Sequence, residues 1–333
     1  MSIDTLSDVL RSIHLRGAVF YYLCFGQEWA VEAPPAQEIA ATVIPGAQHV
    51  IEYYVITKGS GWAAIADQAP VRLETGDIIM FPHGDAHVLS SAPGLEPIRL
   101  FGLDWIHSTR HAPKPVPIMF NRLHAFSFGA PARESVNHVA CGFLGCDLRP
   151  FNLLFATLPR LLHLPAAEEG AWIGPVILQA VNASHNTRPG GEAVLERISE
   201  IMFVDAVRRH VERLPEDSTG WLVGLRDRQV GRALALIHDS PSRAWTIAAL
   251  AGEVALSRSA FYDRFVRLVG QPPIQYLTQW RMDVAATLLR QSGAPVASIA
   301  QDVGYESEAA FTRAFKRQVG TPPARWRRMH NGK

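Results

Sequence analysis

The sequence contains few cysteines, no long apolar run and no export signal, and each absence excludes a class of protein. Three cysteines in 333 residues (Cys24, Cys141 and Cys146) are too few for the disulfide framework of a small secreted protein. No run of about 18 apolar residues occurs, so the sequence predicts no membrane span. The first residues lack the basic start and apolar stretch of a signal peptide. We therefore expect a cytoplasmic protein that does not bind membranes.

The motifs of several common enzyme classes are also missing. The sequence has no Gly-rich phosphate loop, no serine nucleophile elbow and no Cys-x-x-Cys pair. Cys141 and Cys146 have the wrong spacing for a zinc ribbon, so we interpret them as buried thiols. These absences remove those enzyme classes, and with the features described below we expect a protein that is not an enzyme and that requires no cofactor.

The last quarter of the chain contains an internal repeat. Residues 267–273 and 317–323 share five of seven positions at an offset of 50. Each copy has apolar residues at i, i+3, i+4 and i+7, then a turn, a serine that can cap a helix, and a longer apolar stripe that ends at glycine. This unit of short helix, turn and longer helix predicts two helix-turn-helix motifs. Residues 274–290 are predicted to form the helix that joins them.

Charge is distributed unevenly along the chain. Residues 226–333 contain 16 Lys and Arg against 8 Asp and Glu, a net charge of +8, although the whole chain carries only +1. Residues 1–225 therefore carry −7. Such asymmetry favours a polyanionic partner for the basic segment. A basic solvated face on an ordinary helical domain would explain the charge alone, but not the charge together with the repeat.

In helix-turn-helix proteins the second helix enters the major groove and its solvent face meets the base edges. In the first copy, the positions expected to face DNA are Ser257, Arg258, Ser259, Tyr262, Asp263 and Arg267. In the second copy they are Ser307, Glu308, Ala309, Thr312, Arg313 and Lys316.

A longer pattern runs through both copies and the joining helix. Its first half comprises Ala249-Leu250-Ala251, Ser257 to Phe265, Gly270-Gln271-Pro272, Tyr276-Leu277, Arg281, Ala285 and Leu288-Leu289. Its second half comprises Ile299-Ala300, Val303-Gly304-Tyr305, Phe311, Arg313, Phe315-Lys316, Gly320, Pro322-Pro323 and Trp326-Arg327. In this pattern the segment from about 228 to 330 resembles the DNA-binding domain of the AraC/XylS family of bacterial transcription regulators. The resemblance implies a homodimeric regulator, more often an activator than a repressor, whose partners are double-stranded DNA with tandem half-sites, a small-molecule effector and RNA polymerase.

Residues 17–104 have the texture of an all-β domain. Short runs rich in Val, Ile and aromatic residues alternate with Gly and Pro, which predicts strands at 18–25, 52–56, 61–66, 77–81, 86–89 and 98–103. The same region contains two spaced motifs, Glu52-x6-Gly59 and Gly76-x5-Pro82-x-Gly84-x2-His87. They resemble the two motifs of the cupin barrel, which many AraC-type regulators carry as an effector sensor.

Two kinds of site are candidates inside this barrel. Strand alternation suggests effector-binding residues at Tyr22, Tyr54, Trp62 and His87. By resemblance to metal-bearing cupins, a divalent metal could be held by His49, Glu52 and His87, because imidazole and carboxylate suit such ions. A satisfied polar cluster is the other interpretation. A metal-dependent cupin enzyme, or a metal sensor fused to a DNA-binding domain, is therefore an alternative to the effector-responsive regulator.

Residues 151–213 change to a helical texture, with helices expected at 172–183 and 192–213. Apolar residues three or four apart in the longer helix suit pairing with another helix, in a dimer or on the protein's own barrel. We thus expect an α+β, multidomain fold. Its intervals are a cupin-like sensor at 1–110, a connector and helical dimerisation segment at 111–213, a linker at 214–225 and an all-α double helix-turn-helix at 226–333.

Overall fold

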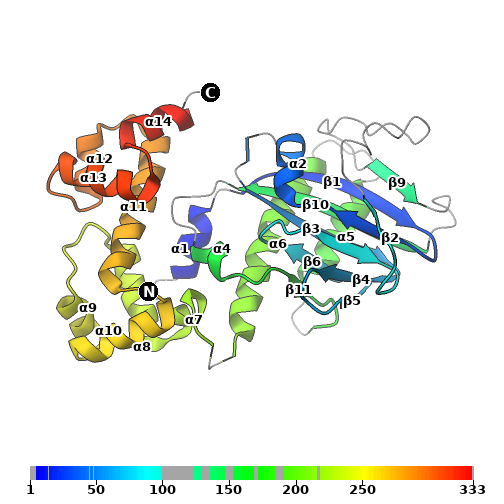
Figure 1. The fold of residues 1–333 in the computed structure, drawn as a ribbon, viewed down its shortest axis with the longest axis horizontal. Coiled ribbons are helices and arrows are strands. Elements are labelled where there is room, and N and C mark those ends of the chain that lie inside the picture. The colour runs from blue at the N-terminus through cyan, green and yellow to red at the C-terminus, as the bar shows by residue number, and fades with distance from the viewer. Residues whose placement is uncertain are drawn as a thin grey trace. The chain divides into compact units, whose positions relative to one another are not determined.

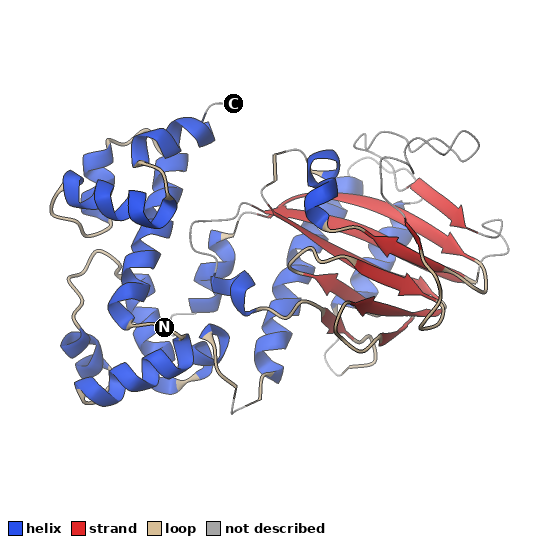
Figure 2. Ribbon diagram, in the orientation of Figure 1, coloured by secondary structure: helices blue, strands red, loops and turns tan. Residues whose placement is uncertain are grey.

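A computed structural model describes residues 5–13, 15–44, 46–47, 49–99, 124–128, 136–146, 153–168, 172–184, 191–215 and 218–331. Contacts divide the chain into two compact units. A sheet unit comprises His14–Asp147 and Leu158–Glu212, and a helical unit comprises Met1–Ile13, Leu148–Thr157 and Arg213–Lys333. Figures 1 and 2 show strands confined to the first unit and helices alone in the second. The expected α+β multidomain fold is confirmed.

Two sheets form the sheet unit. One has the strand order β11-β6-β3-β10-β1-β9 and the other β5-β4-β7-β2-β8. The strands are β1 (Leu15–Phe25), β2 (Ala30–Ala33), β3 (His49–Lys58), β4 (Ser60–Ile65), β5 (Val71–Glu74), β6 (Ile78–Phe81), β7 (His87–Ser90), β8 (Ile98–Arg99), β9 (His124–Phe128), β10 (Asn137–Cys146) and β11 (Leu162–Leu164). Five of the six predicted strands correspond to β1, β3, β4, β6 and β7. The sixth, at 98–103, is described only as far as Arg99, where β8 ends.

The sheet unit extends well beyond the interval expected for the sensor. β10 lies within the region expected to be connector and helix, yet it pairs with β1 on one side and β3 on the other. β11 pairs with β6 where a helical segment was expected, and only α4 (Leu153–Thr157) is helical there. The proline-rich connector expected at 112–117 lies outside the described residues.

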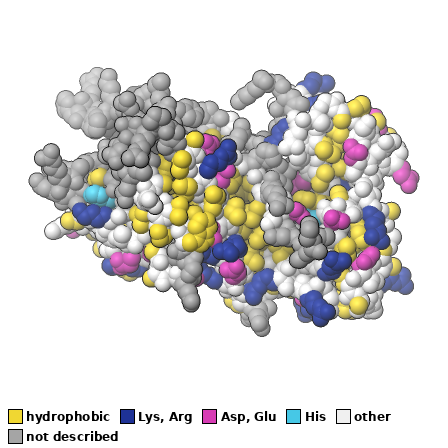
Figure 3. All heavy atoms as spheres, turned by 180° about the vertical axis from the view of Figure 1, so that it is seen from behind, with side chains coloured by type: hydrophobic (Ala, Val, Ile, Leu, Met, Phe, Trp, Pro, Cys, Tyr) yellow, Lys and Arg dark blue, Asp and Glu magenta, His cyan; other side chains and the backbone are white. Residues whose placement is uncertain are grey.

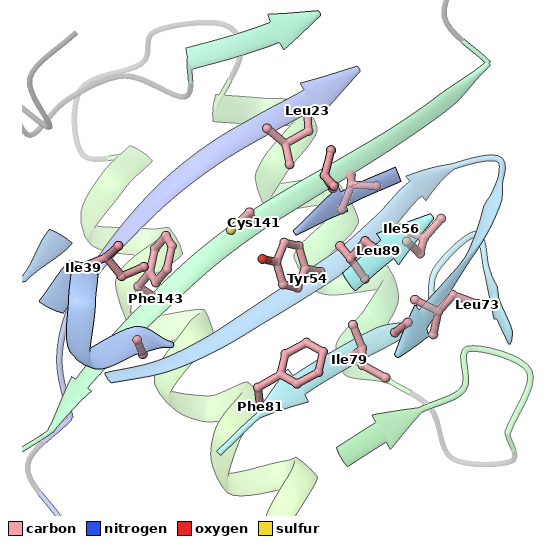
Figure 4. Close-up of a cluster of buried hydrophobic side chains, with 14 of the residues drawn as sticks. Leu23, Ile39, Tyr54, Ile56, Leu73, Ile79, Phe81, Leu89, Cys141 and Phe143 are labelled. Carbon is pink, nitrogen blue, oxygen red and sulfur yellow. The ribbon is translucent and has the colours of Figure 1, made fainter. Parts of the chain in front are cut away.

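The core of the sheet unit lies between the two sheets. Alternate residues of each strand point into it, among them Tyr54 from β3, Phe81 from β6 and Phe143 from β10 (Figure 4). The neighbouring residues point to the opposite face of the larger sheet. There the Tyr53 hydroxyl lies 2.6 Å from the Ser199 hydroxyl of a helix, and a Cβ at Gly142 would stand 2.3 Å from the Tyr53 ring. Glycine in the middle of β10 therefore leaves room for the Tyr53 ring, which a side chain at this position would displace.

Helices cover the outer face of the larger sheet. α6 (Gly191–Arg213) contributes Ser199 to this contact, and α5 (Ile173–Ser184) also packs against β3. Their bounds agree with the helices expected at 172–183 and 192–213. A short helix, α2 (Ala36–Val43), also packs on β3, and its Ile39 and Val43 belong to the core between the sheets.

The helical unit contains the two predicted helix-turn-helix motifs. Its helices are α7 (Trp221–Arg226), α8 (Arg228–Asp239), α9 (Ile247–Glu253), α10 (Arg258–Val269), α11 (Pro273–Gln291), α12 (Val296–Asp302), α13 (Glu308–Val319) and α14 (Pro323–Asn331). Part of the expected linker is thus the helix α7. Its Trp221 is fully buried, and the Trp221 indole N–H donates to the Tyr276 hydroxyl of α11 at 3.0 Å.

Two segments distant from the carboxy terminus also belong to the helical unit. α1 (Thr5–Ser12) packs on α8, and α4 packs on α7. Val9 of α1 and Leu154 of α4 are buried. The unit boundaries therefore differ from the contiguous intervals expected from the sequence, because residues near both ends of the sensor region fold with the helix-turn-helix motifs.

Candidate nucleic-acid interface

The second helices of the two motifs, α10 and α13, begin and end in the same way. The Ser257 hydroxyl accepts a hydrogen bond from the Ala260 N–H at 3.2 Å, and the Ser307 hydroxyl accepts one from Ala310 at the same distance. Each helix ends at a glycine in the left-handed region, Gly270 with φ 81° and Gly320 with φ 79°. These caps fix the bounds of both helices.

Each of these helices has one buried aromatic face and one solvent face. Phe261 and Phe265 of α10 are fully buried, as are Phe311 and Phe315 of α13. Eleven of the twelve positions that were predicted to face DNA are exposed. They are Arg258, Ser259, Tyr262, Asp263 and Arg267 on α10, Glu308, Ala309, Arg313 and Lys316 on α13, and the caps Ser257 and Ser307. The twelfth, Thr312, is half-buried.

The caps and the remaining positions differ in what they can offer a ligand. Because the hydroxyls of Ser257 and Ser307 already accept from the helix backbone, their first task is structural. Arg258, Arg267, Arg313 and Lys316, by contrast, form no ion pair within the described part of the chain. Four exposed cations are therefore free to meet an anion.

Sequence reasoning missed the residue that holds α10 in place. The Arg264 guanidinium binds both carboxylate oxygens of Asp227, with Nε at 3.1 and 3.0 Å. Asp227 also caps α8, accepting from the N–H groups of Gln229 and Val230. Arg264 lowers the pKa of Asp227 against the opposing effect of burial. One carboxylate thereby fixes α10 to the start of α8. An aspartate one residue before a helix is a local signal for a cap, but no local signal marks the partner arginine.

The sheet unit holds a buried polar cluster within its apolar core, consisting of Glu52, Tyr54, His87 and Cys141. The Tyr54 hydroxyl lies 2.5 Å from Glu52 Oε1 and 2.9 Å from His87 Nε2. His87 Nδ1 lies 2.8 Å from the Asp85 carbonyl oxygen, and Cys141 Sγ lies 3.6 Å from Glu52 Oε1. Figure 4 shows Tyr54 and Cys141 pointing into the space between the sheets.

These distances fit an uncharged hydrogen-bonded chain. Because a carbonyl oxygen only accepts, His87 Nδ1 must carry the proton, and neutral Nε2 then accepts from the Tyr54 hydroxyl. The Tyr54 hydroxyl has one hydrogen, so once this hydrogen is donated to His87 the contact with Glu52 Oε1 requires a protonated Glu52 that donates to the Tyr54 oxygen. Burial raises the pKa of Glu52 to about 7 and lowers the pKa of His87 to about 4, and both shifts favour the neutral forms.

The structure brings two of the four predicted effector-binding residues together. Tyr54 and His87 are hydrogen-bonded in the core. The expectation for Trp62 is wrong, because Ala63 and Ile65 of β4 face the core and alternation turns Trp62 outward. The Arg72 guanidinium lies 5.5 Å from the centroid of its ring. Tyr22 lies in β1, and its side chain is outside the described residues.

The predicted metal set is not assembled in the same way. Glu52 Oε2 and His87 Nε2 are 3.9 Å apart, but His49 is three residues from Glu52 on a regular strand and lies on the other face. Its Nε2 bonds instead to the Pro82 carbonyl oxygen at 2.6 Å. Within the described ranges, no three His, Cys, Asp or Glu side chains form a group that could hold a metal ion. The residues present do not fit a cupin metal centre.

Two family models match this chain. Residues 4–212 match a cupin family, and residues 250–329 match a helix-turn-helix domain. Fold and site together define a DNA-binding transcription regulator with an amino-terminal cupin domain. An AraC-like transcription regulator of Streptomyces lividans is 32% identical over 98% of both chains. The regulator AlkR of Acinetobacter baylyi is 27% identical over 98% of this chain and 99% of that one. The chain belongs to the AraC-like family of transcription regulators.

A solved structure matches part of the chain. The DNA-binding domain of AdpA, solved with a target DNA, is 28% identical, covers 32% of this chain and 95% of that one, and has a TM-score of 0.30. No helix in the described part of the chain is long and apolar enough to cross a bilayer.

Proposed function

We propose that this regulator binds tandem DNA half-sites, with α10 in one major groove and α13 in the next. The observation that carries the proposal is the pair of matched helices, each with a serine cap, a glycine end, a buried aromatic face and an exposed face. Arginines and lysines on the exposed faces would neutralise phosphates or donate to guanine. The excess of eight positive charges in residues 226–333 supports the same partner.

Acidic residues on these faces indicate that bases are read as well as phosphates. Asp263 and Glu308 are both exposed there. A carboxylate repels the backbone phosphates but accepts from the cytosine amine in the major groove. We therefore expect each of these positions to lie over a base pair, and each to contribute to sequence preference.

The test is selection of DNA by the full chain from a randomised duplex library, followed by titration of the enriched duplex by fluorescence anisotropy. Two conserved blocks centred about 10 base pairs apart would support the proposal. A single conserved block would contradict it, and so would affinity that does not depend on sequence. Arg72→Ala removes an exposed cation from the sheet unit, away from α10 and α13. It is the control for the loss of one positive charge and should bind the enriched duplex as wild type does.

We further propose that two copies associate through α6. One face of this helix is buried within the sheet unit and includes Leu195, Met202 and Phe203. A second face stays in solvent at intervals of three and four residues, and we call its members the α6 seam: Val194, Arg197, Ile201, Val204 and Arg208. Three of the five are apolar although exposed, Val194 by 54%, Ile201 by 46% and Val204 by 39%. Such a spacing suits helix pairing.

Charge along α6 favours an antiparallel pair centred near Ile201. The first half carries Glu196, Arg197 and Glu200 at exposed or half-buried positions, and the second half carries Arg208, Glu212 and Arg213. The first set has a net charge of −1 and the second +1, so antiparallel halves attract each other. α5 and α6 lie behind the sheet in Figure 1 and face the viewer in Figure 3, where hydrophobic side chains are exposed among charged ones.

The cupin domain is proposed to sense an effector rather than to turn over a substrate. Tyr54 and His87, together with Glu52 and Cys141, are the polar groups that an entering molecule would meet in an otherwise apolar core. We propose that the cupin domain senses the effector without a resident metal, because Glu52 and His87 are already hydrogen-bonded to Tyr54. By family resemblance, the regulator is proposed to act in the cytoplasm as an activator that contacts RNA polymerase.

Two segments provide a covalent route from the barrel to the DNA-binding helices. Leu15 at the start of β1 pairs with Cys146 at the end of β10, so the two strands meet the flanking segments at one end. α1 precedes β1 and α4 follows β10, and both helices belong to the helical unit. We propose that an effector that displaces this strand pair shifts the population of DNA-binding arrangements through α1 and α4.

A further inference from the structure

We propose that Arg281 is a positioning residue that locks the two helix-turn-helix motifs together, and that this lock sets the half-site spacing that the regulator accepts. The inference rests on the two-site binding proposed above. It concerns contacts within the helical unit, between the connection that enters the first motif and the turn inside the second.

Arg281 lies in α11 and binds the connection between α8 and α9. Its Nε donates to the Pro241 carbonyl oxygen at 2.7 Å, and one terminal nitrogen donates to the Arg243 carbonyl oxygen at 2.9 Å. The planar guanidinium can serve two such acceptors at once, which an ammonium cannot do with the same fixed geometry. The connection is itself well held, since the Trp245 indole N–H donates to the Ser240 carbonyl at 3.0 Å.

The same guanidinium also meets the second motif. Its Cζ lies 5.8 Å from the centroid of the Tyr305 ring, within the range of a cation–π contact. Tyr305 belongs to the turn between α12 and α13, and its ring packs edge-on against the buried Phe311 of α13. Through one side chain, Arg281 therefore connects α11 with the entry to the first motif and, by way of Tyr305, with α13 of the second motif.

Gly304 shows how closely the two motifs approach. A Cβ built there would lie 2.5 Å from the Ser242 carbonyl oxygen and 2.8 Å from a terminal nitrogen of Arg281. The first motif provides an internal comparison, because Ala255 occupies the matching turn position at an offset of 49 and adopts φ 56°. An alanine thus adopts the left-handed backbone of this turn. Glycine at 304 is required by the contact with Ser242 and Arg281 as well as by its φ of 81°.

This junction decides whether both helices can engage one duplex face. Two readers joined at a fixed separation gain from a high effective concentration, and that gain is lost when their geometry does not match the two sites. A helix with no further contact would hold the motifs less firmly than a helix braced at Arg281. The lock should therefore raise affinity at the correct spacing and penalise any other spacing.

The experiment uses the full chain and the duplex that wild type selects from a randomised library. Affinity is measured for that duplex, for a duplex with one block scrambled and for a duplex with one base pair inserted between the blocks. For Arg281→Ala and Gly304→Ala we expect affinity for the intact duplex to fall by about 10- to 100-fold. Affinity for the scrambled duplex should stay near that of wild type, and the insertion should cost these variants less than it costs wild type.

Two further variants separate the lock from other effects. Arg281→Lys keeps the positive charge but loses the planar arrangement of donors that binds two carbonyl oxygens at once. Ala255→Gly changes the matching turn of the first motif without altering the contacts of Arg281. Full affinity in Arg281→Lys would mean that Arg281 contacts phosphate, which overturns the proposal, as would an unchanged insertion penalty in Gly304→Ala. If wild type itself ignores the insertion, two-site binding fails first. Circular dichroism confirms that each variant retains its helices.

Discussion

Arg313 and Phe315 lie two residues apart on α13 and differ completely in surroundings. Arg313 is exposed and has no ion pair among the described residues, whereas Phe315 is fully buried. Arg313→Ala should therefore weaken binding to the selected duplex and leave the thermal midpoint nearly unchanged. The loss should be about 1–3 kcal/mol if Arg313 reads a base. If it binds only phosphate, the salt dependence of affinity should fall by about one unit of slope instead. Undiminished affinity would contradict the site assignment.

Phe315→Ala should have the opposite profile. Phe315 packs between Phe311 and Trp326, with ring centroids 5.5 and 6.3 Å away, in the core formed by α11 to α14. Removing the ring should lower the free energy of unfolding by about 3–5 kcal/mol, as large core truncations do. Denaturant titration monitored by circular dichroism checks this. A cost below 1 kcal/mol would mean that the ring is far less buried than the structure shows.

Glu52 and His87 should make opposite contributions to the pH dependence of stability. The pKa of Glu52 is raised to about 7, so its protonated form stabilises the fold, and this stability is lost as pH rises from 4.5 to about 7. The pKa of His87 is lowered to about 4, so stability is lost as pH falls from 6.5 towards 4. The two slopes offset each other in wild type. Glu52→Gln keeps a neutral side chain and removes the first slope.

The difference between this variant and wild type isolates the carboxyl group. Glu52→Gln should gain stability relative to wild type as pH rises from 4.5 to 7, by an amount on the order of 3 kcal/mol. Thermal midpoints measured at intervals across this range check the sign. A relative loss over the same interval would indicate a charged Glu52 in the folded state.

Metal analysis of the same wild-type sample should give a substoichiometric content, and one metal ion per chain would contradict the metal-free barrel.

At the scale of elements, α6 carries two interfaces on one helix. In the proposed dimer the α6 seam of one copy packs against the α6 seam of the other, so Ile201 of both copies is buried at the centre of the interface. Ile201→Asp should convert the dimer to a monomer at micromolar concentration, as sedimentation velocity would show. Ile98→Asp is the matched control, since Ile98 is 64% exposed on β8 of the same unit and lies outside the α6 seam. A wild-type chain that stays monomeric at all concentrations would remove the proposal altogether.

Elements differ in how far the sequence predicts them. The bounds of α10 and α13 could be predicted because a serine cap and a glycine end are local signals. β10 could not, because Gly142 and Gly145 interrupt its pattern and it is buried on both faces, so no alternation marks it. Strand alternation predicted an inward Trp62, but alternation leaves the choice of face open, and in β4 it is Ala63 and Ile65 that face the core.

The sites show the same division. The reading faces of both motifs follow from helical periodicity, which places every fourth or third residue on one side. Residues far apart in sequence were not foreseen, such as Asp227 with Arg264, Arg281 with Gly304, and Cys141 with Glu52. Each pair depends on how elements pack, and packing leaves no mark on local spacing.

At the scale of the whole molecule, membership of a unit does not follow chain order, and this can be tested with two leucines. Leu144 of β10 and Leu154 of α4 are both fully buried, but they belong to different units. Leu154→Ala should lower hydrogen-exchange protection in α7, on which α4 packs, and leave β3 protected. Leu144→Ala should lower protection in β1 and β3, its partner strands.

Each truncation should cost about 2–5 kcal/mol, which is large enough to be resolved region by region. If Leu154→Ala lowered protection in the strands and left α7 protected, α4 would belong to the sheet unit. The proposed connection from the sheet unit to the DNA-binding helices would then run through α1 alone. If Leu144→Ala deprotected α7 as well as its own sheet, a disturbance in β10 would reach the DNA-binding helices without any effector. That second outcome would indicate coupling through the strand pair β1 and β10, which ends at Leu15 and Cys146.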